Sequence, residues 1–189
     1  PHTPYDAPAP FAGRHDSAAL KLAPEPATTN EERGYVPGVF QEDSKQAATE
    51  EDRRREMASY YDNVAWMDHN LGLILGAAPK NTVIVFVSDH GYSLREHNGF
   101  SFHKKFLIEA NARTPLYIQA PGFEPRTVSR VVSHVDIYRT VLDLLDVESP
   151  AETDGESLVP LMQGGTASRG YAITEVRADD GRAGGVRIT

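Results

Sequence analysis

The 189-residue sequence contains no cysteine. Disulfides, thiolate metal sites and cysteine nucleophiles are therefore excluded within this chain. No apolar run approaches the roughly 20 residues of a membrane-spanning helix, and neither a signal peptide nor an Asn-x-Ser/Thr sequon is visible. Positive charge is scarce as well, because the formal net charge is -8. That balance argues against a general nucleic-acid or membrane binder, so an anionic substrate would need a local basic cluster.

What is present indicates a real hydrophobic core, since 40% of the residues are hydrophobic. Residues 1–48 differ from the rest, being rich in Pro, Ala, Gly and charge. Proline fixes φ and lacks a backbone donor. This part is therefore predicted to be an extended wrapping arm with turns, packed on a larger body.

A long amphipathic helix is predicted after the arm. Thr49 and Asp52 form a capping box, which starts the helix, and Pro79 stops it. The charged run EEDRRRE at its start is expected to face solvent. Apolar residues recur at spacings of three and four and predict one buried face: Met57, Tyr60, Tyr61, Val64, Met67, Leu71, Ile74 and Leu75.

Residues 83–87 form a continuous, β-branched apolar run, typical of a strand buried on both faces of a parallel sheet. A second strand is expected at residues 116–120. Ser133 and Asp136 form a second possible capping box, which opens a helix with Ile137, Val141, Leu142, Leu144 and Leu145 facing inward.

After this helix, the segment DGESLVPLMQGG predicts a loop with a short helical turn. Residues 171–176 predict a further strand, and the tail begins another. The alternation of helices and strands favours an α/β fold. The expected domain organisation is one partial domain over residues 1–189: the arm to residue 48, a core over 49–147, and a loop with the start of a C-terminal region over 148–189.

The strand at residues 83–87 ends in Ser-Asp-His-Gly, which places Asp89 and His90 where open α/β sheets bind ligands. A carboxylate suits Ca²⁺, Mg²⁺ or Mn²⁺, and an imidazole also suits Zn²⁺ or Mn²⁺. Two ligands do not complete a site. On its own, the pair is more typical of a turn-forming Asp and a solvated His than of a metal site.

The following loop adds a cluster of basic side chains. His97, His103, Lys104, Lys105 and Arg113 lie within a short span. Cations beside an acidic pair fit an anionic group bound against a metal ion. The alternative is an ordinary basic loop.

The order strand-SDHG, Glu-His, Lys and Glu-x-x-x-Arg-x-Pro-Leu resembles the sulfatase family of the alkaline phosphatase superfamily, closest to its iduronate-2-sulfatase-like and choline-sulfatase-like members. The opening PHTPY, the helix segment YYDNVAWMD, and the segments SHVDIYRTVLDLLDV and DGESLVPLMQGG also resemble parts of that family. The resemblance implies part of a mixed, mainly parallel sheet flanked by helices, truncated at both ends.

The resemblance also implies roles for individual residues. Asp89 and His90 would bind the active-site cation, usually Ca²⁺, with Mg²⁺ or Mn²⁺ as alternatives. In the family a Lys eleven residues before the Pro of Arg-x-Pro contacts the sulfate; counting back from Pro115 gives Lys104. His2 inherits the role of a His that contacts the sulfate ester and protonates the leaving oxygen.

Three further residues are expected to contact substrate. Arg95 stands where the family often has Gly, and it either reaches an acidic group of the substrate or faces water. His97 belongs to the Glu-His pair, and the sequence leaves open whether that pair touches substrate. His103 is expected to line the pocket.

The family's nucleophile is a formylglycine made from Cys or Ser in a Cys/Ser-x-Pro/Ala-x-Arg segment, which this sequence lacks. The chain is therefore expected to be the C-terminal portion of a sulfatase, catalytically incomplete alone, with the nucleophile supplied by an N-terminal part or chain. By resemblance the enzyme would be periplasmic or secreted and would hydrolyse a sulfated sugar or small sulfate ester. Two alternatives remain open: a phosphodiesterase or phosphonate monoester hydrolase of the superfamily, and a non-catalytic sulfatase-like binding module.

Overall fold

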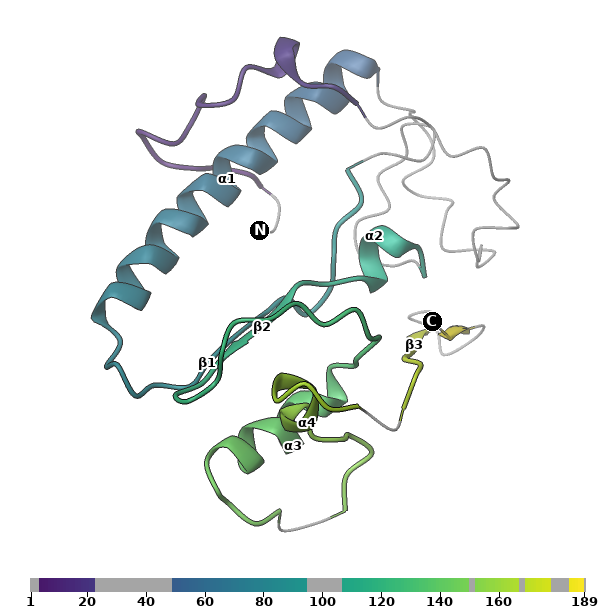
Figure 1. The fold of residues 1–189 in the computed structure, drawn as a ribbon. Coiled ribbons are helices and arrows are strands. Elements are labelled where there is room, and N and C mark those ends of the chain that lie inside the picture. The colour runs from purple at the N-terminus through teal and green to yellow at the C-terminus, as the bar shows by residue number, and fades with distance from the viewer. Residues whose placement is uncertain are drawn as a thin grey trace. The chain divides into compact units, whose positions relative to one another are not determined.

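The computed structural model describes residues 4–22, 49–94, 107–149, 152–166, 169–177 and 184–188 (Figure 1). The chain divides into two units. The first contains Pro1–Ala78 and His90–Arg113, and the second contains Pro79–Asp89 and Thr114–Thr189. Within the described ranges, no helix is both long and apolar enough to cross a membrane.

The first unit is built on the long helix α1, Glu50–Ala77. The predicted capping box is confirmed: the Thr49 hydroxyl accepts from the Asp52 N–H at 3.1 Å, and the Asp52 carboxylate accepts from the Thr49 N–H at 3.2 Å. The helix ends at Ala77, just before Pro79, as predicted. Local signals alone therefore determine both ends of α1.

The predicted apolar face of α1 is buried over only part of the helix. Met57 is 7% exposed, whereas Ile74 is 67% exposed. The expectation that the whole charged run faces solvent is wrong, because Arg53 is only 8% exposed. Arg53 lies four residues before Met57 and so on the same helix face, where its aliphatic stem can pack.

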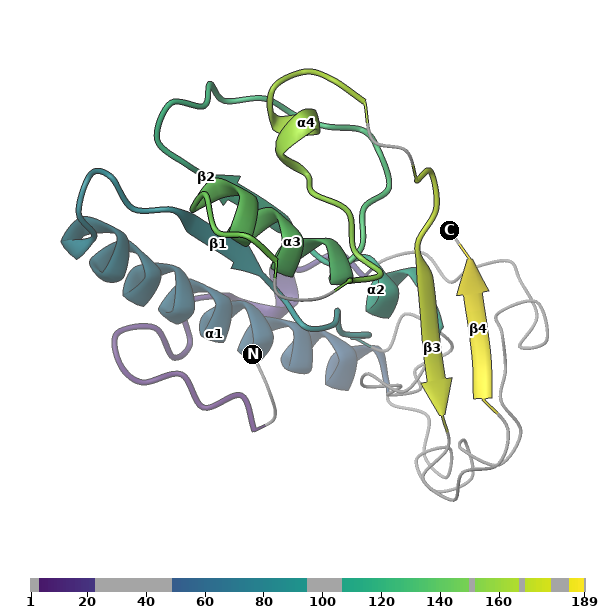
Figure 2. The same cartoon turned by 90° about the horizontal axis from the view of Figure 1, so that it is seen from below.

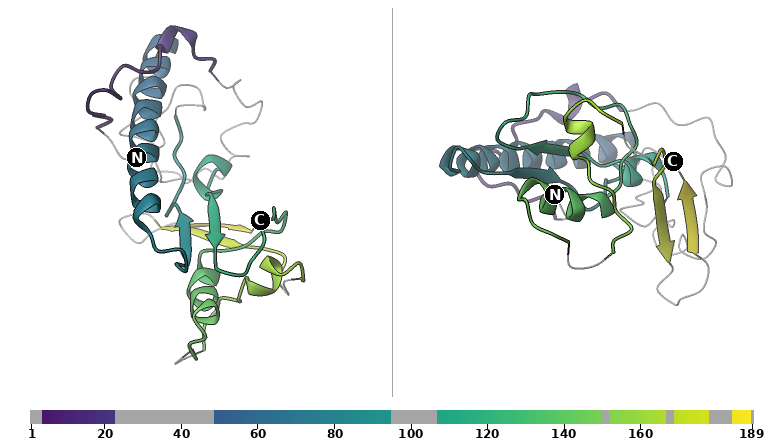
Figure 3. Two further views of the ribbon diagram at one scale, coloured as in Figure 1. Left: turned by 60° about the vertical axis from the view of Figure 1, so that its left-hand side comes forward. Right: turned by 60° about the horizontal axis from the view of Figure 1, so that its bottom comes forward.

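The arm lies along α1 over its described part, residues 4–22 (Figures 1 and 3). It is extended with turns, as predicted, and contains one short 3-10 helix, η1, Ser17–Ala19, capped by Asp16. The rest of the predicted arm lies outside the described residues. The same unit contains a single-turn helix, α2, Glu109–Ala112, in a region predicted to be loop.

In the second unit, strands β1, Ile84–Val87, and β2, Leu116–Gln119, pair antiparallel, with Val87 opposite Leu116. The predicted strands exist, but the expected parallel pairing is wrong for this pair. Full burial on both faces is wrong as well, since Val87 is 37% exposed. An apolar β-branched run predicts a strand, whereas its direction depends on where the chain returns to the sheet.

The second unit also contains α3, Val135–Leu144, and the short α4, Val159–Met162. Both helices were predicted. Most of the expected inward residues of α3 are half-buried, and Leu145 is 55% exposed. The side chains that are buried on α3 are instead polar, Asp136 and Thr140.

The last two strands form a hairpin. Strands β3, Ile173–Arg177, and β4, Gly184–Ile188, pair antiparallel with Ile173 opposite Ile188. Figure 2 shows them side by side and running in opposite directions. Both strands were predicted from the sequence.

Candidate active site

Two of the seven residues singled out by the sequence are described, Asp89 and His90. The division between the two units falls between them. The predicted roles of the other five stay predictions, because these residues lie outside the described residues: His2, Arg95, His97, His103 and Lys104.

Asp89 belongs to the second unit and follows β1 by two residues. Its side chain is exposed. This position is the one predicted from the strand-to-loop transition. A carboxylate is the hard oxygen ligand that Ca²⁺ and Mg²⁺ prefer.

His90 belongs to the first unit and is half-buried. Its Nδ1 lies 2.7 Å from the Gly91 carbonyl oxygen. Since a carbonyl can only accept, Nδ1 carries the proton, and the lone pair of the neutral ring is on Nε2. A backbone contact of this kind commonly orients metal-binding imidazoles.

Gly91 is required at its position by close backbone packing. Its N–H donates to the Asn111 carbonyl at 2.8 Å. A Cβ at this residue would lie 1.8 Å from the Ala110 carbonyl oxygen. Only glycine allows α2 to approach the residue after His90 so closely.

The residues that follow Gly91 are firmly packed in the first unit. Ser93 is 0% exposed and Leu94 is 9% exposed. On the α2 side, Ile108 and Asn111 are also buried. Buried residues after Gly91 and around α2 therefore hold the segment that carries His90.

Three tyrosines gather beside this segment. The Tyr5 ring lies edge-on to Tyr60 at 5.5 Å and to Tyr92 at 5.9 Å between centroids, and Tyr60 stacks on Tyr92 at 6.0 Å. Burial, reinforced by the neighbouring Tyr92 and by Glu56, raises the pKa of the Tyr5 phenol well above its usual value. Tyr5 is therefore neutral at physiological pH.

A buried carboxylate on α1 holds a later part of the arm. Asp62 accepts from the Gly13 N–H at 2.6 Å, from the His15 N–H at 3.0 Å and from His15 Nδ1 at 2.8 Å. Burial alone would raise the pKa of Asp62, but the hydrogen bonds from His15 and Gly13 outweigh it and hold the pKa below its usual value. The sequence interpretation did not identify Asp62. The available signal was a carboxylate four residues after Ala58 on a buried helix face.

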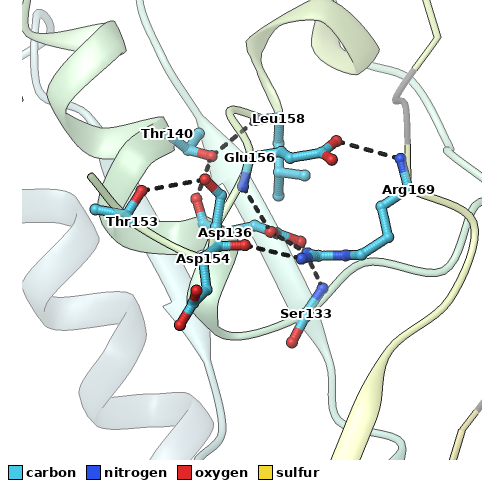
Figure 4. Close-up of polar contacts among 9 residues, drawn as sticks. Ser133, Asp136, Thr140, Thr153, Asp154, Glu156, Leu158 and Arg169 are labelled. Carbon is cyan, nitrogen blue, oxygen red and sulfur yellow. Dashed lines mark hydrogen bonds and ion pairs between the residues drawn. The ribbon is translucent and has the colours of Figure 1, made fainter.

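A second buried carboxylate organises the second unit (Figure 4). Asp136 accepts from the Ser133 N–H at 2.8 Å, from the Glu156 N–H at 2.9 Å and from the Arg169 guanidinium. On the same helix, the Thr140 hydroxyl donates to the Asp136 carbonyl at 2.6 Å and accepts from the Leu158 N–H at 2.9 Å. The sequence predicted a capping box of Ser133 and Asp136, of which only the bond from the Ser133 N–H to the Asp136 carboxylate forms. The other half is wrong, because the N-cap of α3 is His134 and no side chain caps it.

The described residues by themselves do not form a complete metal site. No group of three or more His, Asp or Glu side chains that could hold a metal ion lies within these ranges. Asp89 and His90 are nevertheless of the residue types that could hold a metal ion, and with the proton on Nδ1 it is Nε2 of His90 that could coordinate one.

A profile of the sulfatase family matches residues 1–147. Arylsulfatase K from Gallus gallus is 39% identical over 120 residues, which cover 60% of this chain and 22% of that protein. The choline-sulfatase of Rhizobium meliloti is 36% identical over 124 residues, which cover 61% of this chain and 24% of that protein. The chain therefore spans less than a quarter of the length of these two relatives.

Two solved structures have a similar fold. A phosphonate monoester hydrolase from Silicibacter pomeroyi has a TM-score of 0.78 and 27% identity, covering 94% of this chain and 38% of that one. A protein solved in complex with its substrate, D-glucosamine-2-N,6-O-disulfate, has a TM-score of 0.56 and 27% identity, covering 73% of this chain and 31% of that one. The fold is thus the mixed α/β fold of the alkaline phosphatase and sulfatase superfamily. Since the family profile covers most of the chain, the chain belongs to the sulfatase family.

Proposed function

We propose that the intact protein is a metal-dependent sulfuric ester hydrolase, a sulfatase. The observation that carries this proposal is the family match over residues 1–147. That range contains the Asp-His pair after β1, the Lys of the following loop and the Arg-x-Pro element in the order that the family shows.

Asp89 and His90 would hold the cation, with Ca²⁺ as the first choice and Mg²⁺ or Mn²⁺ as alternatives. Asp89 offers an exposed carboxylate, and His90 offers Nε2 because its Nδ1 donates to the Gly91 carbonyl. A cation bound there would supply Lewis-acid neutralisation of negative charge on the sulfate oxygens. The remaining ligands would come from outside the described residues.

The other residues act on the sulfate ester directly in this proposal. Lys104 neutralises the charge that develops on the sulfate oxygens, which is usually a large catalytic contribution. His2 gives a proton to the leaving alcohol oxygen. Contacts with the rest of the substrate are assigned to Arg95, His97 and His103.

The nucleophile is assigned to a formylglycine outside these 189 residues, which contain no Cys and no Ser in a matching segment. Another part of the same protein, or an N-terminal partner chain, would supply it. We assign the enzyme to the periplasm or the exterior of the cell, an assignment that follows from the family resemblance. Fractionation of the native cells tests that location.

The proposed substrate is a sulfated sugar, with a small sulfate ester as the broader class. The similar fold of a protein that binds a disulfated glucosamine supports the sugar. The choline-sulfatase relative supports the broader class. A chain of net charge -8 attracts a polyanion only through a local basic cluster, and residues 95–113 contain one.

Parallel assays of the intact protein on a sulfate ester and on a phosphate diester test the reaction class. We expect faster turnover of the sulfate ester, loss of activity with EDTA, and recovery on addition of Ca²⁺. Much faster turnover of the diester would overturn the proposal.

Substitution of two adjacent lysines tests which of them contacts the sulfate. Lys104→Ala should lower kcat by about 100-fold or more, as expected for removal of a group that stabilises transition-state charge. Lys105→Ala is the matched control and should lower kcat much less. Equal losses would assign the sulfate contact to a different position.

Phosphonate monoester hydrolysis is the second candidate, because a phosphonate monoester hydrolase matches 94% of this chain with a TM-score of 0.78. The two reactions share a tetrahedral anion and a metal ion, so geometry separates them poorly. The ratio of kcat/KM for a phosphonate monoester to that for the sulfate ester decides between them.

A further inference from the structure

The apolar face of α1 is covered over its first half and open over its second half. Met57, Val64 and Leu71 follow one another at intervals of two helical turns, and Leu75 stands one turn further on, so all four share one side of the helix. Met57 is 7% exposed, whereas Leu75 is 42% exposed and its neighbour Ile74 is 67% exposed. The same face that packs inside the first unit therefore continues without a cover.

The uncovered half ends in a run of exposed residues, 72–77, of which three are large and apolar. We call Met67, Leu71, Ile74 and Leu75 the open face, because their spacings of three and four place them together on the continuation of the buried side. Soluble proteins rarely leave neighbouring apolar side chains exposed in this way unless a partner covers them. The open face is thus a candidate docking surface.

The charges around the open face restrict the kind of partner. Residues 66–77 contain one carboxylate, Asp68, and neither Lys nor Arg. A nucleic acid or a sulfated glycan would require cations there, and a helix that lies on a membrane surface usually carries Lys or Arg along its polar face. The partner that fits is an apolar surface of a folded polypeptide.

The length of the relatives indicates where such a surface would come from. The matched residues make up 22% of the arylsulfatase K relative and 24% of the choline-sulfatase relative. Most of the length of each relative thus lies outside the region to which this chain corresponds. The continuity of the open face with the buried half of α1 favours a partner within the same folded domain.

We propose that the open face of α1 is the surface against which the formylglycine-bearing part of the intact protein packs. This inference rests on the proposed function, which assigns the nucleophile to a part outside these 189 residues. The four side chains act by apolar contact and hold that part to this chain.

Hydroxyl-radical footprinting of the intact protein tests whether the open face is covered. Met67 is 40% exposed and the adjacent Trp66 is 39% exposed, but Trp66 lies about 100° around the helix axis from Met67 and off the open face. Compared with the urea-unfolded protein, oxidation of Met67 should be suppressed several-fold more than oxidation of Trp66. Equal suppression, or a protection of Met67 that weakens on dilution as for a second copy, would overturn the proposal.

Two adjacent substitutions measure the contribution of the open face to stability. Ile74→Gln places an amide in an apolar interface and should lower the thermal midpoint of the intact protein by about 2 °C or more. Leu73→Gln is the matched control, because Leu73 is 61% exposed and lies off the open face; its shift should stay below about 1 °C. Similar shifts for the two variants would contradict the proposal, and the wild-type footprint still decides if Ile74→Gln does not fold.

A photo-reactive benzophenone amino acid in place of Leu75 identifies the partner. Cross-links in the intact protein should lie outside residues 1–189, in the part that carries the formylglycine. Cross-links confined to residues 1–189, to a second copy or to any other protein would overturn the inference. Since neither cross-linking nor footprinting needs turnover, an intact protein that hydrolyses no sulfate ester would refute the proposed function without deciding what covers the open face.

Discussion

In each unit, a buried aspartate on a helix accepts hydrogen bonds from irregular chain. The two aspartates have similar sets of hydrogen-bond donors. Asp62 accepts two backbone N–H groups and one imidazole nitrogen, and Asp136 accepts two backbone N–H groups and one guanidinium. Their surroundings differ. The side chains of Asp62 and His15 are 9% and 34% exposed, whereas those of Asp136 and Arg169 are 3% and 18% exposed.

The comparison indicates that similar hydrogen bonds contribute differently to the free energy of unfolding when the exposure of their partners differs. Water can replace the partners of Asp62 once the arm lifts away from α1. The partners of Asp136 are more deeply enclosed than those of Asp62. Losing Asp136 should therefore leave an uncompensated buried charge, which is the costlier defect.

The largest effect is expected from Asp136→Ala. Because this change leaves Arg169 buried without its partner, it should lower the free energy of unfolding by about 3–5 kcal/mol. Urea unfolding of the intact protein measures the change.

The control for this substitution is Asp143→Ala on the same helix, which breaks the partly exposed Arg139–Asp143 pair. That loss should be about 0–1 kcal/mol. Similar losses for Asp136→Ala and Asp143→Ala would contradict the role given to burial.

A glycine lies in each of the two chain segments that bond these aspartates, Gly13 for Asp62 and Gly155 for Asp136. Gly155 precedes Glu156, and a Cβ on it would lie 1.9 Å from the Val135 carbonyl oxygen. Gly155→Ala should therefore destabilise the protein by about 1–3 kcal/mol or more, because the backbone has to move.

Gly13 has open space around its Cβ position but a φ of +72°. Gly13→Ala should cost about 1–2 kcal/mol of backbone strain, and Gly13→Asn should cost less because Asn tolerates this conformation. Unfolding curves of all three variants decide the point. Equal costs for the Ala and Asn variants at Gly13 would rule out strain as the cause.

Asp62→Asn should have a smaller effect on overall stability, about 1–2 kcal/mol, since it removes the charge from three hydrogen bonds whose partner His15 is partly exposed. Its clearest result should be faster amide exchange over residues 11–16. Unchanged exchange there would show that other contacts hold the arm.

The smallest effect is the pH dependence of the same contact. Because the folded-state pKa of Asp62 is depressed, its contribution is complete above the unfolded value of about 4 and is lost as pH falls through the folded value. The stability difference between wild type and Asp62→Asn should therefore shrink as the pH is lowered from about 6 to 3. A difference that stays constant over this range would refute the carboxylate's role.

Several elements were predictable because their determinants are local. Thr49 and Asp52 lie three residues apart and cap each other, and Pro79 ends the helix wherever the helix packs. The apolar run at residues 83–87 indicated β1, but its antiparallel pairing with β2 depends on a chain return that no short window contains.

The candidate site likewise has a part that was predictable from local sequence and a part that was not. Asp89 and His90 were found from a strand that ends in two ligand-type side chains. The turn after them depends on Gly91 meeting the Ala110 carbonyl, a contact across 19 positions that no local motif signals. The aromatic cluster was also missed, because Tyr60 was interpreted only as part of a helix face and Tyr5 only as part of the arm.

The sequence by itself determined where α1 starts and stops and which segments are strands, because each of these depends on residues close together along the chain. It also determined the family, because that depends on short motifs and their order along the chain. Only the tertiary structure decided that Arg53 is buried, that β1 and β2 run antiparallel, and that Asp62 and Asp136 each fasten distant chain to a helix. The physical reason is that an aspartate in a sequence does not indicate its hydrogen-bond partners. Those partners depend on which backbone N–H groups the fold brings within about 3 Å of the carboxylate.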